Sequence, residues 1–172
     1  MKKTLTLFCF VFFFALQGKS QTVVPLKFQQ IVQKLVLQLP AQQTAGQLIS
    51  FAKTLIGSPY HYASRNPKRG FDCSGFVSYV FENFGFSVPR SSREFPDAGT
   101  PVSLENAKVG DVLIFTGTNP RVRKIGHVGI IYSINGDEIK FIHSTSGKAH
   151  GVTITQMDDY YRSRFLKAVS II

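Results

Sequence analysis

The sequence predicts an α+β domain in which helices come first and an antiparallel sheet of about five strands follows. Up to Gly85, apolar residues recur every three or four positions, as on one face of a helix. Beyond Gly110 the apolar runs are short, rich in Val, Ile and Phe, and separated by Gly, Asn and Asp. With 44% hydrophobic residues, the chain of 172 residues has enough apolar material for a core, which excludes a disordered protein.

Residues 1–20 have the pattern of a secretory signal peptide. A basic start precedes the apolar run Thr4–Leu16, and the small residues Gly18 and Ser20 then precede the expected cleavage site. The apolar run is shorter than the roughly 17 to 25 residues that a transmembrane helix needs. Cleavage would remove three lysines and no acidic residue, so the net charge falls from +10 to +7. We therefore expect export to the periplasm or the exterior, without stable membrane insertion.

Two helices are predicted between the signal peptide and Cys73. Residues 21–44 form a helical extension whose apolar spacing continues to Leu39, and Pro40 is expected to end that helix. A second helix is predicted over Thr44–Ile56, ended by Gly57-Ser58-Pro59. The remainder, residues 45–172, is expected to be a single domain.

A third helix begins at Cys73, the single cysteine that remains after cleavage. Asp72 suits an N-cap, and a thiol in the first turn faces the free N–H groups and the positive dipole end, which lower a thiol pKa. Gly75 is expected to leave the approach to the sulfur open. The alternative is a buried, inert thiol, but such a residue would fall on the apolar face of Phe76 and Val80. The position therefore favours a reactive nucleophile.

Two histidines lie at one end of a predicted hairpin. The five expected strands are Asp111–Thr116, His127–Ile134, Glu138–Ser144, Val152–Thr155 and Phe165–Ile171. A two-residue turn at Asn135-Gly136 without a bulge would put His127 and His143 on opposite faces, whereas a loop with an odd number of residues puts them directly opposite each other. A nucleophilic cysteine needs a histidine base and an orienting group, so the catalytic hypothesis predicts the odd loop. Alternatively, each histidine is a hydrogen-bonded structural residue.

Six short motifs, in this order and spacing, resemble the NlpC-type family of papain-like bacterial cell-wall cysteine peptidases. The resemblance covers about residues 45–172, nearly all of the expected mature chain. The motifs are Gly57–Tyr60, Phe71–Val77, Val88–Ser92, Val109–Phe115, Gly126–Tyr132 and Phe141–Ser144.

The resemblance implies a papain-like fold and a Cys-His-His triad. Cys73 would be the nucleophile, His127 the general base and His143 the residue that orients the His127 ring. The implied activity is hydrolysis of peptidoglycan stem peptides through a thioester, at the bond between γ-linked D-glutamate and a diamino acid. Stem-peptide carboxylates suit a basic protein, although charge alone does not select a substrate.

Other positions follow from the same resemblance. The hydroxyl of Tyr60 would lie near the sulfur and assist the oxyanion, while Asp72 and Ser74 would line the pocket for the free amino end of the substrate. Family members usually carry a Gly-Gly pair where this chain has Ala63-Ser64. Because glycine adopts backbone conformations that Ala and Ser avoid, we expect a reshaped loop and an altered substrate pocket.

Three other functions are compatible with parts of the sequence. Cys73, His127 and His143 could bind zinc, but no local metal-ligand spacing accompanies them. Basic loops could bind nucleic acid, but they flank the expected site and suit an acidic substrate better. An amidase, an acyltransferase or a non-catalytic wall-binding protein on the same fold stays open. The sequence thus predicts no metal, no cofactor and no nucleic acid, and leaves the oligomeric state open.

Overall fold

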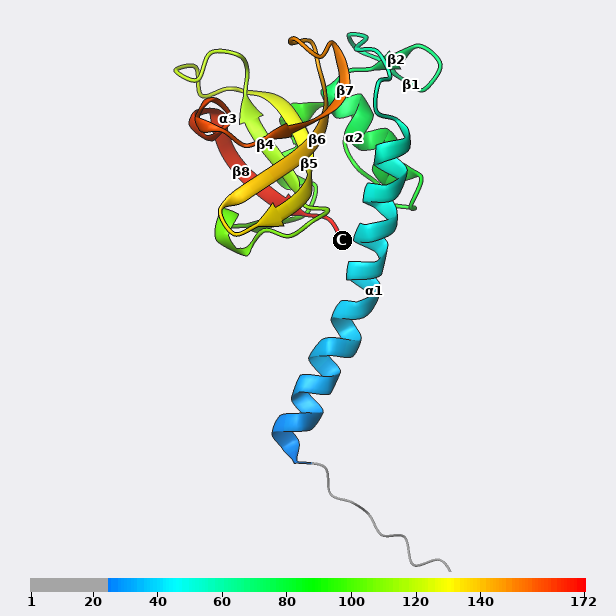
Figure 1. The fold of residues 1–172 in the computed structure, drawn as a ribbon, viewed down its shortest axis with the longest axis vertical. Helices are drawn as coiled ribbons and strands as arrows, with labels where there is room; N and C mark the ends of the chain where they lie inside the picture. Colours follow the sequence, from blue (N-terminus) through cyan, green and yellow to red (C-terminus); the bar gives the residue numbers. More distant parts are fainter. Residues whose placement is uncertain (1–24) are drawn as a thin grey trace, which may run out of the picture. The chain divides into compact units, whose positions relative to one another are not determined.

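The computed structural model describes residues 25–172 (Figure 1). The predicted signal peptide, residues 1–20, lies outside the described residues. The chain divides into two units after Leu37, and the second unit, Gln38–Ile172, contains the sheet and the candidate site. Among the described residues, no helix has both the length and the apolar character needed to cross a membrane.

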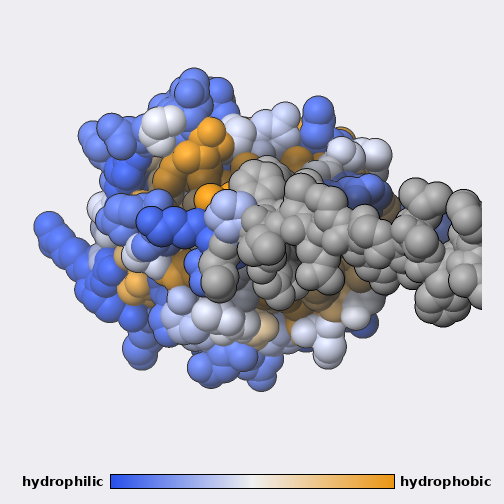
Figure 2. Space-filling view, turned by 90° about the horizontal axis from the view of Figure 1, so that it is seen from below, coloured by the Kyte–Doolittle hydropathy of each residue, from blue (hydrophilic) through white to orange (hydrophobic). Residues whose placement is uncertain are grey.

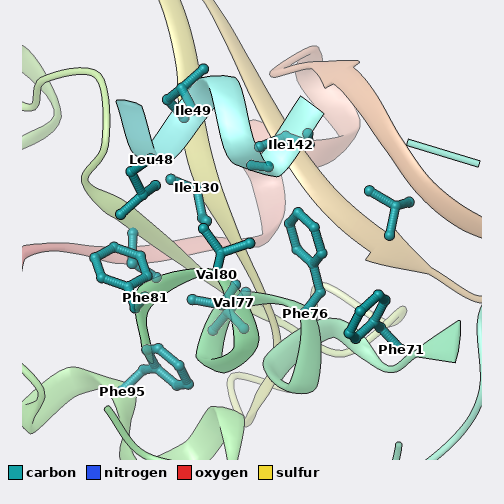
Figure 3. Packing of buried hydrophobic residues seen from close by; sticks show 14 of the residues in the cluster. Leu48, Ile49, Phe71, Phe76, Val77, Val80, Phe81, Phe95, Ile130 and Ile142 are labelled. Carbon is teal, nitrogen blue, oxygen red and sulfur yellow. The ribbon is translucent and has the colours of Figure 1, made fainter. Parts of the chain in front are cut away.

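The first helix, α1, runs over Leu26–Thr54 as one element. The prediction that Pro40 ends a helix is therefore wrong. A proline removes one backbone hydrogen bond, but the Gln, Leu and Ala residues around it are good helix formers. In the last turns, Leu48, Ile49 and Ala52 are buried in the core of the second unit (Figure 3).

The helix that carries the cysteine, α2, spans Cys73–Glu82 and confirms the expected cap. Asp72 is the N-cap, and its carboxylate accepts a hydrogen bond of 2.6 Å from the N–H of Gly75. Shortly after the helix, Gly85 has a φ of 82°, a left-handed conformation that favours glycine. The core face consists of fully buried side chains, which Figure 3 shows packed together: Phe76, Val77, Val80 and Phe81.

The main sheet of the domain is antiparallel and has six strands, in the order β3-β8-β4-β5-β6-β7, and β1 and β2 form a separate two-stranded sheet. The five predicted strands are all present, as β4 Val112–Thr116, β5 Ile125–Asn135, β6 Glu138–Thr145, β7 Gly151–Gln156 and β8 Phe165–Ser170. The elements not expected from the sequence are β1 Arg65–Asn66, β2 Gly70–Phe71, β3 Thr100–Val102, α3 Asp159–Arg164 and the 3-10 turns Ser92–Asp97 and Leu104–Asn106.

Both faces of the central strands are buried, which explains their almost continuous apolar sequence. One face, with Ile114, Ile130 and Ile142, packs against α2 and the end of α1. The other face, with Phe115 and Phe141, packs against α3 and the segment before it. Complete burial of each such side chain contributes about 1.5–3 kcal/mol. On the face seen in Figure 2, hydrophilic side chains predominate and apolar ones form smaller separate areas.

The β5–β6 hairpin does not have the expected loop. Its turn has two residues, Gly136-Asp137, closed by the pair Asn135↔Glu138, so the prediction of an odd loop is wrong. A bulge at Tyr132 then shifts the register, and Ile130 pairs with Ile142. The extra residue brings His127 and His143 to the same face.

The two histidines are diagonal neighbours in this register and are not directly opposite each other. Gly129 is the residue opposite His143, and a Cβ on Gly129 would lie 3.1 Å from the Cβ of His143. The glycine therefore leaves space beside His143 on the shared face. The bulge in β5, and not an odd loop, thus places both histidines on one face.

Candidate active site

The loop before α2 is fixed against the first turn of the helix. The N–H of Asp72 donates to the carbonyl of Ser64 over 3.0 Å, and a Cβ on Gly75 would clash with that same carbonyl. Gly75 is thus needed for close packing of loop and helix, not for an open approach to the sulfur. Ala63 has a φ of 56°, so the loop keeps a conformation that favours glycine, at a cost of roughly 1–2 kcal/mol.

The sulfur of Cys73 lies beside the start of β5. Sγ is 4.0 Å from the carbonyl oxygen of Gly126, and the N–H of Val128 also interacts with it. Gly126 and Val128 are the neighbours of His127 in the chain, so the sulfur lies against the backbone that carries His127. Cys73 itself is partly exposed and forms no disulfide.

The electrostatic environment of Cys73 differs from the sequence prediction. Burial raises the pKa of the thiol, and the nearby carboxylate of Asp72 raises it further. The backbone N–H of Val128 on β5, and those of Ser74 and Cys73 at the helix N-terminus, lower the pKa, but they offset only part of the increase. The expected low pKa is therefore wrong, because desolvation of a thiolate outweighs the helix end here. The thiol is neutral at rest.

Next to the sulfur, a chain of hydrogen bonds crosses three strands. Nε2 of His127 lies 2.7 Å from Nδ1 of His143, with the two rings nearly perpendicular. Nε2 of His143 lies 2.9 Å from Oγ1 of Thr155 on β7. The contact between His127 and His143 is a direct hydrogen bond, which does not fit a zinc site formed by these two rings and Cys73.

Both imidazoles are buried and neutral. Burial lowers the pKa of His127 to about 3, and the charge of Arg164 contributes to this shift. Burial, then His127 and Arg164, lower the pKa of His143 well below its usual value. Arg164 is buried on α3, donates to the carbonyls of Thr116 and Gly117, and lies over the rings of two tyrosines, Tyr160 and Tyr161.

On the other side of the sulfur, Arg90 joins Asp72 and Ser74. The guanidinium donates to both carboxylate oxygens of Asp72, over 2.6 and 3.0 Å, and to the hydroxyl of Ser74 over 3.1 Å. The hydroxyl of Ser78 donates to the carbonyl of Pro89, which holds the segment carrying Arg90 against α2. Tyr60 also lies close to this group. Burial raises the pKa of its hydroxyl, and the charges of Cys73 and Asp72 raise that pKa further.

The structure thus brings the predicted site residues to one place, and adds three that sequence reasoning did not assign. Arg90 could have been found, because it lies inside one of the recognised motifs, Val88–Ser92. Thr155 and Arg164 lie outside every motif, and no local pattern distinguishes them.

A cysteine at the N-terminus of a helix, packed on an antiparallel sheet that carries the histidines, is the arrangement of papain-like proteins. Residues 57–170 match the model of the NlpC/P60 family, and the chain belongs to this family.

Relatives with assigned names support this placement. The chain is 32% identical over 131 residues to gamma-DL-glutamyl hydrolase of Bacillus subtilis (strain 168), which covers 74% of this chain and 30% of the relative. It is 38% identical over 104 residues to murein DD-endopeptidase MepS/murein LD-carboxypeptidase of Escherichia coli (strain K12), with 59% and 50% covered. The chain therefore spans half or less of the length of these two relatives. The solved structure of peptidoglycan hydrolase RipB from Mycobacterium tuberculosis has a TM-score of 0.61 and 26% identity, over 77% of this chain and 66% of that one.

Proposed function

We propose that this chain is a cysteine endopeptidase that hydrolyses peptidoglycan stem peptides between γ-linked D-glutamate and a diamino acid. The observation that carries the proposal is the position of the Cys73 sulfur against the backbone on both sides of His127, while His143 is hydrogen-bonded to Nε2 of the His127 ring. A nucleophile, a base and an orienting group are the parts that acyl transfer by a thiol requires. The names of the relatives supply the substrate class.

The first chemical step is proton transfer from sulfur to nitrogen. When Nε2–H of His127 donates to His143, Nδ1 of His127 has a free lone pair and can accept the Cys73 proton. Because burial keeps the thiol neutral at rest, this general base is required to form the attacking thiolate.

The remaining steps form and break one acyl–sulfur bond. The sulfur attacks the substrate carbonyl, and the oxyanion accepts hydrogen bonds from the N–H of Cys73 and the hydroxyl of Tyr60. Collapse of this intermediate breaks the C–N bond, and the leaving amine takes the proton from His127. Water then gives a proton to His127 and attacks the thioester, which releases the carboxylic acid and restores the thiol.

The charged groups at the start of α2 suit the amino end of a stem peptide. Asp72 and Ser74 lie side by side and are both hydrogen-bonded to Arg90. We place the free ammonium group of the substrate at these two residues, because a carboxylate and a hydroxyl both accept hydrogen bonds from it. Arg90 keeps the two acceptors together before the substrate binds.

Export is part of the same proposal, because the substrate lies outside the cytoplasm. Residues 1–20 are proposed to be a signal peptide that is removed before Gln21. Sequencing the amino end of protein recovered from the periplasm or medium tests this, and protein that retains Met1 there would contradict it.

The main experiment is digestion of whole peptidoglycan, and of released stem peptides with a free amino end, by the wild-type protein and by Cys73→Ala, followed by mass spectrometry of the new ends. We expect wild type to release a free amine on the diamino acid and a free γ-carboxyl on D-glutamate, and Cys73→Ala to release neither. Circular dichroism checks that the variant is folded. Equal product from Cys73→Ala would contradict the nucleophile, and new D-alanine carboxyl ends would assign a different bond.

A further inference from the structure

The hydroxyl of Thr155 is hydrogen-bonded to Nε2 of His143, the second residue of the histidine pair. Thr155 lies on β7, the edge strand beside β6, and its Oγ1 is 2.9 Å from Nε2 of His143. In the β6–β7 register, His143 pairs with Thr153 and Phe141 pairs with Thr155, so Thr155 reaches His143 diagonally on one face. No motif of the sequence includes this residue.

The surroundings of His143 make this hydroxyl hard to replace. His143 is fully buried, with the ring of Phe141 at 4.5 Å and the ring of Tyr161 at 5.8 Å between centroids. In the part of the chain that the structure describes, its ring makes two side-chain hydrogen bonds, one to His127 and one to Thr155. The charged group that acts on both rings is Arg164, a cation that offers no acceptor.

A neutral imidazole has one N–H donor and one acceptor nitrogen. For Nδ1 of His127 to accept the Cys73 proton, Nε2 of His127 must carry the hydrogen and donate it to Nδ1 of His143. His143 must then carry its own hydrogen on Nε2, and that N–H needs an acceptor. Oγ1 of Thr155 is the acceptor within reach.

The acceptor for Nε2–H of His143 matters most after the proton has moved from Cys73 to His127. A protonated His127 donates from Nε2, and the opposite tautomer of His143 would point an N–H at that donor. We propose that Thr155 is a positioning residue that, by accepting from Nε2–H of His143, holds His143 in the tautomer that orients His127 as the base. The inference rests on the proposed function, and it adds Thr155 as a fourth residue to Cys73, His127 and His143.

The kinetic test compares Thr155→Val with Thr155→Ser on a synthetic γ-D-glutamyl–diamino acid peptide. Valine has nearly the same shape but no hydroxyl, so kcat should fall about 10-fold to 100-fold, the range seen when the outer hydrogen-bond partner of a metal-bound histidine is removed. KM should stay unchanged, because Thr155 is not placed against substrate. Thr155→Ser should restore most of the activity.

Thr153→Val is the matched control. It removes the same hydroxyl from the same face of β7, two residues away, at a position for which no hydrogen bond to His143 is described. It should keep the wild-type kcat. Wild-type kcat in Thr155→Val, or equal losses in Thr155→Val and Thr155→Ser, would overturn the proposal.

A second measurement depends neither on the variants nor on activity. The ¹⁵N shifts of the imidazole nitrogens in the wild-type protein report which nitrogen of His143 carries the hydrogen. We expect it on Nε2, and a hydrogen on Nδ1 would overturn the inference even if the variants lose activity. If wild type cleaves no peptidoglycan, the proposed function fails, while this measurement still decides the role of Thr155.

Discussion

The two halves of the candidate site differ in charge and in exposure. The nucleophile half, at the start of α2, holds an ion pair between Asp72 and Arg90, and Cys73 is partly exposed. The base half, on β5 to β7, is closed, with His143 fully buried and His127 9% exposed. One half is therefore polar and accessible to a substrate, whereas in the other both imidazoles are buried and uncharged.

Despite this difference, burial is the main cause of the protonation state on both sides. Burial raises the pKa of the Cys73 thiol and lowers the pKa of His127, so each group loses its charged form. A thiolate–imidazolium pair is consequently not present at rest, and the proposed mechanism moves the proton from Cys73 to His127 during the reaction. The variants below test each half in turn.

The largest effect is expected from His127→Gln, which removes the base. The glutamine keeps a polar side chain beside His143 but cannot take a proton from Cys73, so kcat/KM should fall about 10²-fold to 10⁴-fold. Stem-peptide hydrolysis measures the loss, and His61→Gln is the control because His61 is exposed and bonded to Tyr62 and Arg69. Loss of less than a few-fold in His127→Gln would remove His127 from the proposed mechanism.

Arg164→Met tests how the base half stays neutral. Burial is the main cause of the low pKa of His127, and the charge of Arg164 is the second. Without that charge the pKa of His127 rises part of the way toward 6.5, so the acid limb of the kcat/KM profile should move to higher pH, with a several-fold loss below about pH 4. Arg164→Lys keeps the charge and should keep the limb in place.

Stability must be measured at the same pH values. The unfolded chain binds protons on histidine below about pH 6.5, whereas His127 stays neutral in the fold down to about pH 3. The unfolded state then binds more protons, so the free energy of unfolding falls as the pH decreases through this window. Thermal melts separate this loss from the catalytic one. An identical acid limb in Arg164→Met and wild type would contradict the role of the Arg164 charge.

In the nucleophile half, Arg90→Met should slow alkylation of Cys73 by iodoacetamide. The guanidinium compensates the carboxylate of Asp72, whose charge raises the pKa of the thiol. Without Arg90 that pKa increases further, and the rate at pH 7 should fall about threefold to tenfold. Arg90→Lys retains a positive charge and should react at an intermediate rate. A faster reaction in Arg90→Met would contradict this account.

The smallest effect is expected from Ala63→Gly in the loop beside α2. Glycine adopts the φ of 56° without the steric cost of a Cβ, but it also gains freedom in the unfolded chain. The net stabilisation should be about 1 kcal/mol or less, measured by denaturant unfolding, with unchanged kcat. A loss of stability would show that the Ala63 side chain makes a favourable contact.

Local features of the sequence were sufficient for much of the fold and for half of the site. The cap at Asp72, the helix at Cys73 and the five strands each depend on a few adjacent residues, and the motifs identified the family. The nucleophile half is local in this sense, since Asp72, Cys73 and Ser74 are consecutive. Arg90, which was not predicted as a member of this half, also lies within a recognised motif.

Only the tertiary structure decided the rest. The bulge at Tyr132 and the neutral thiol of Cys73 depend on register between strands and on burial, which local patterns do not contain. Thr155 and Arg164 reach the histidines from elements far along the chain. The sequence by itself predicted the candidate residues of the site, whereas packing decided their protonation states and the hydrogen bonds that orient them.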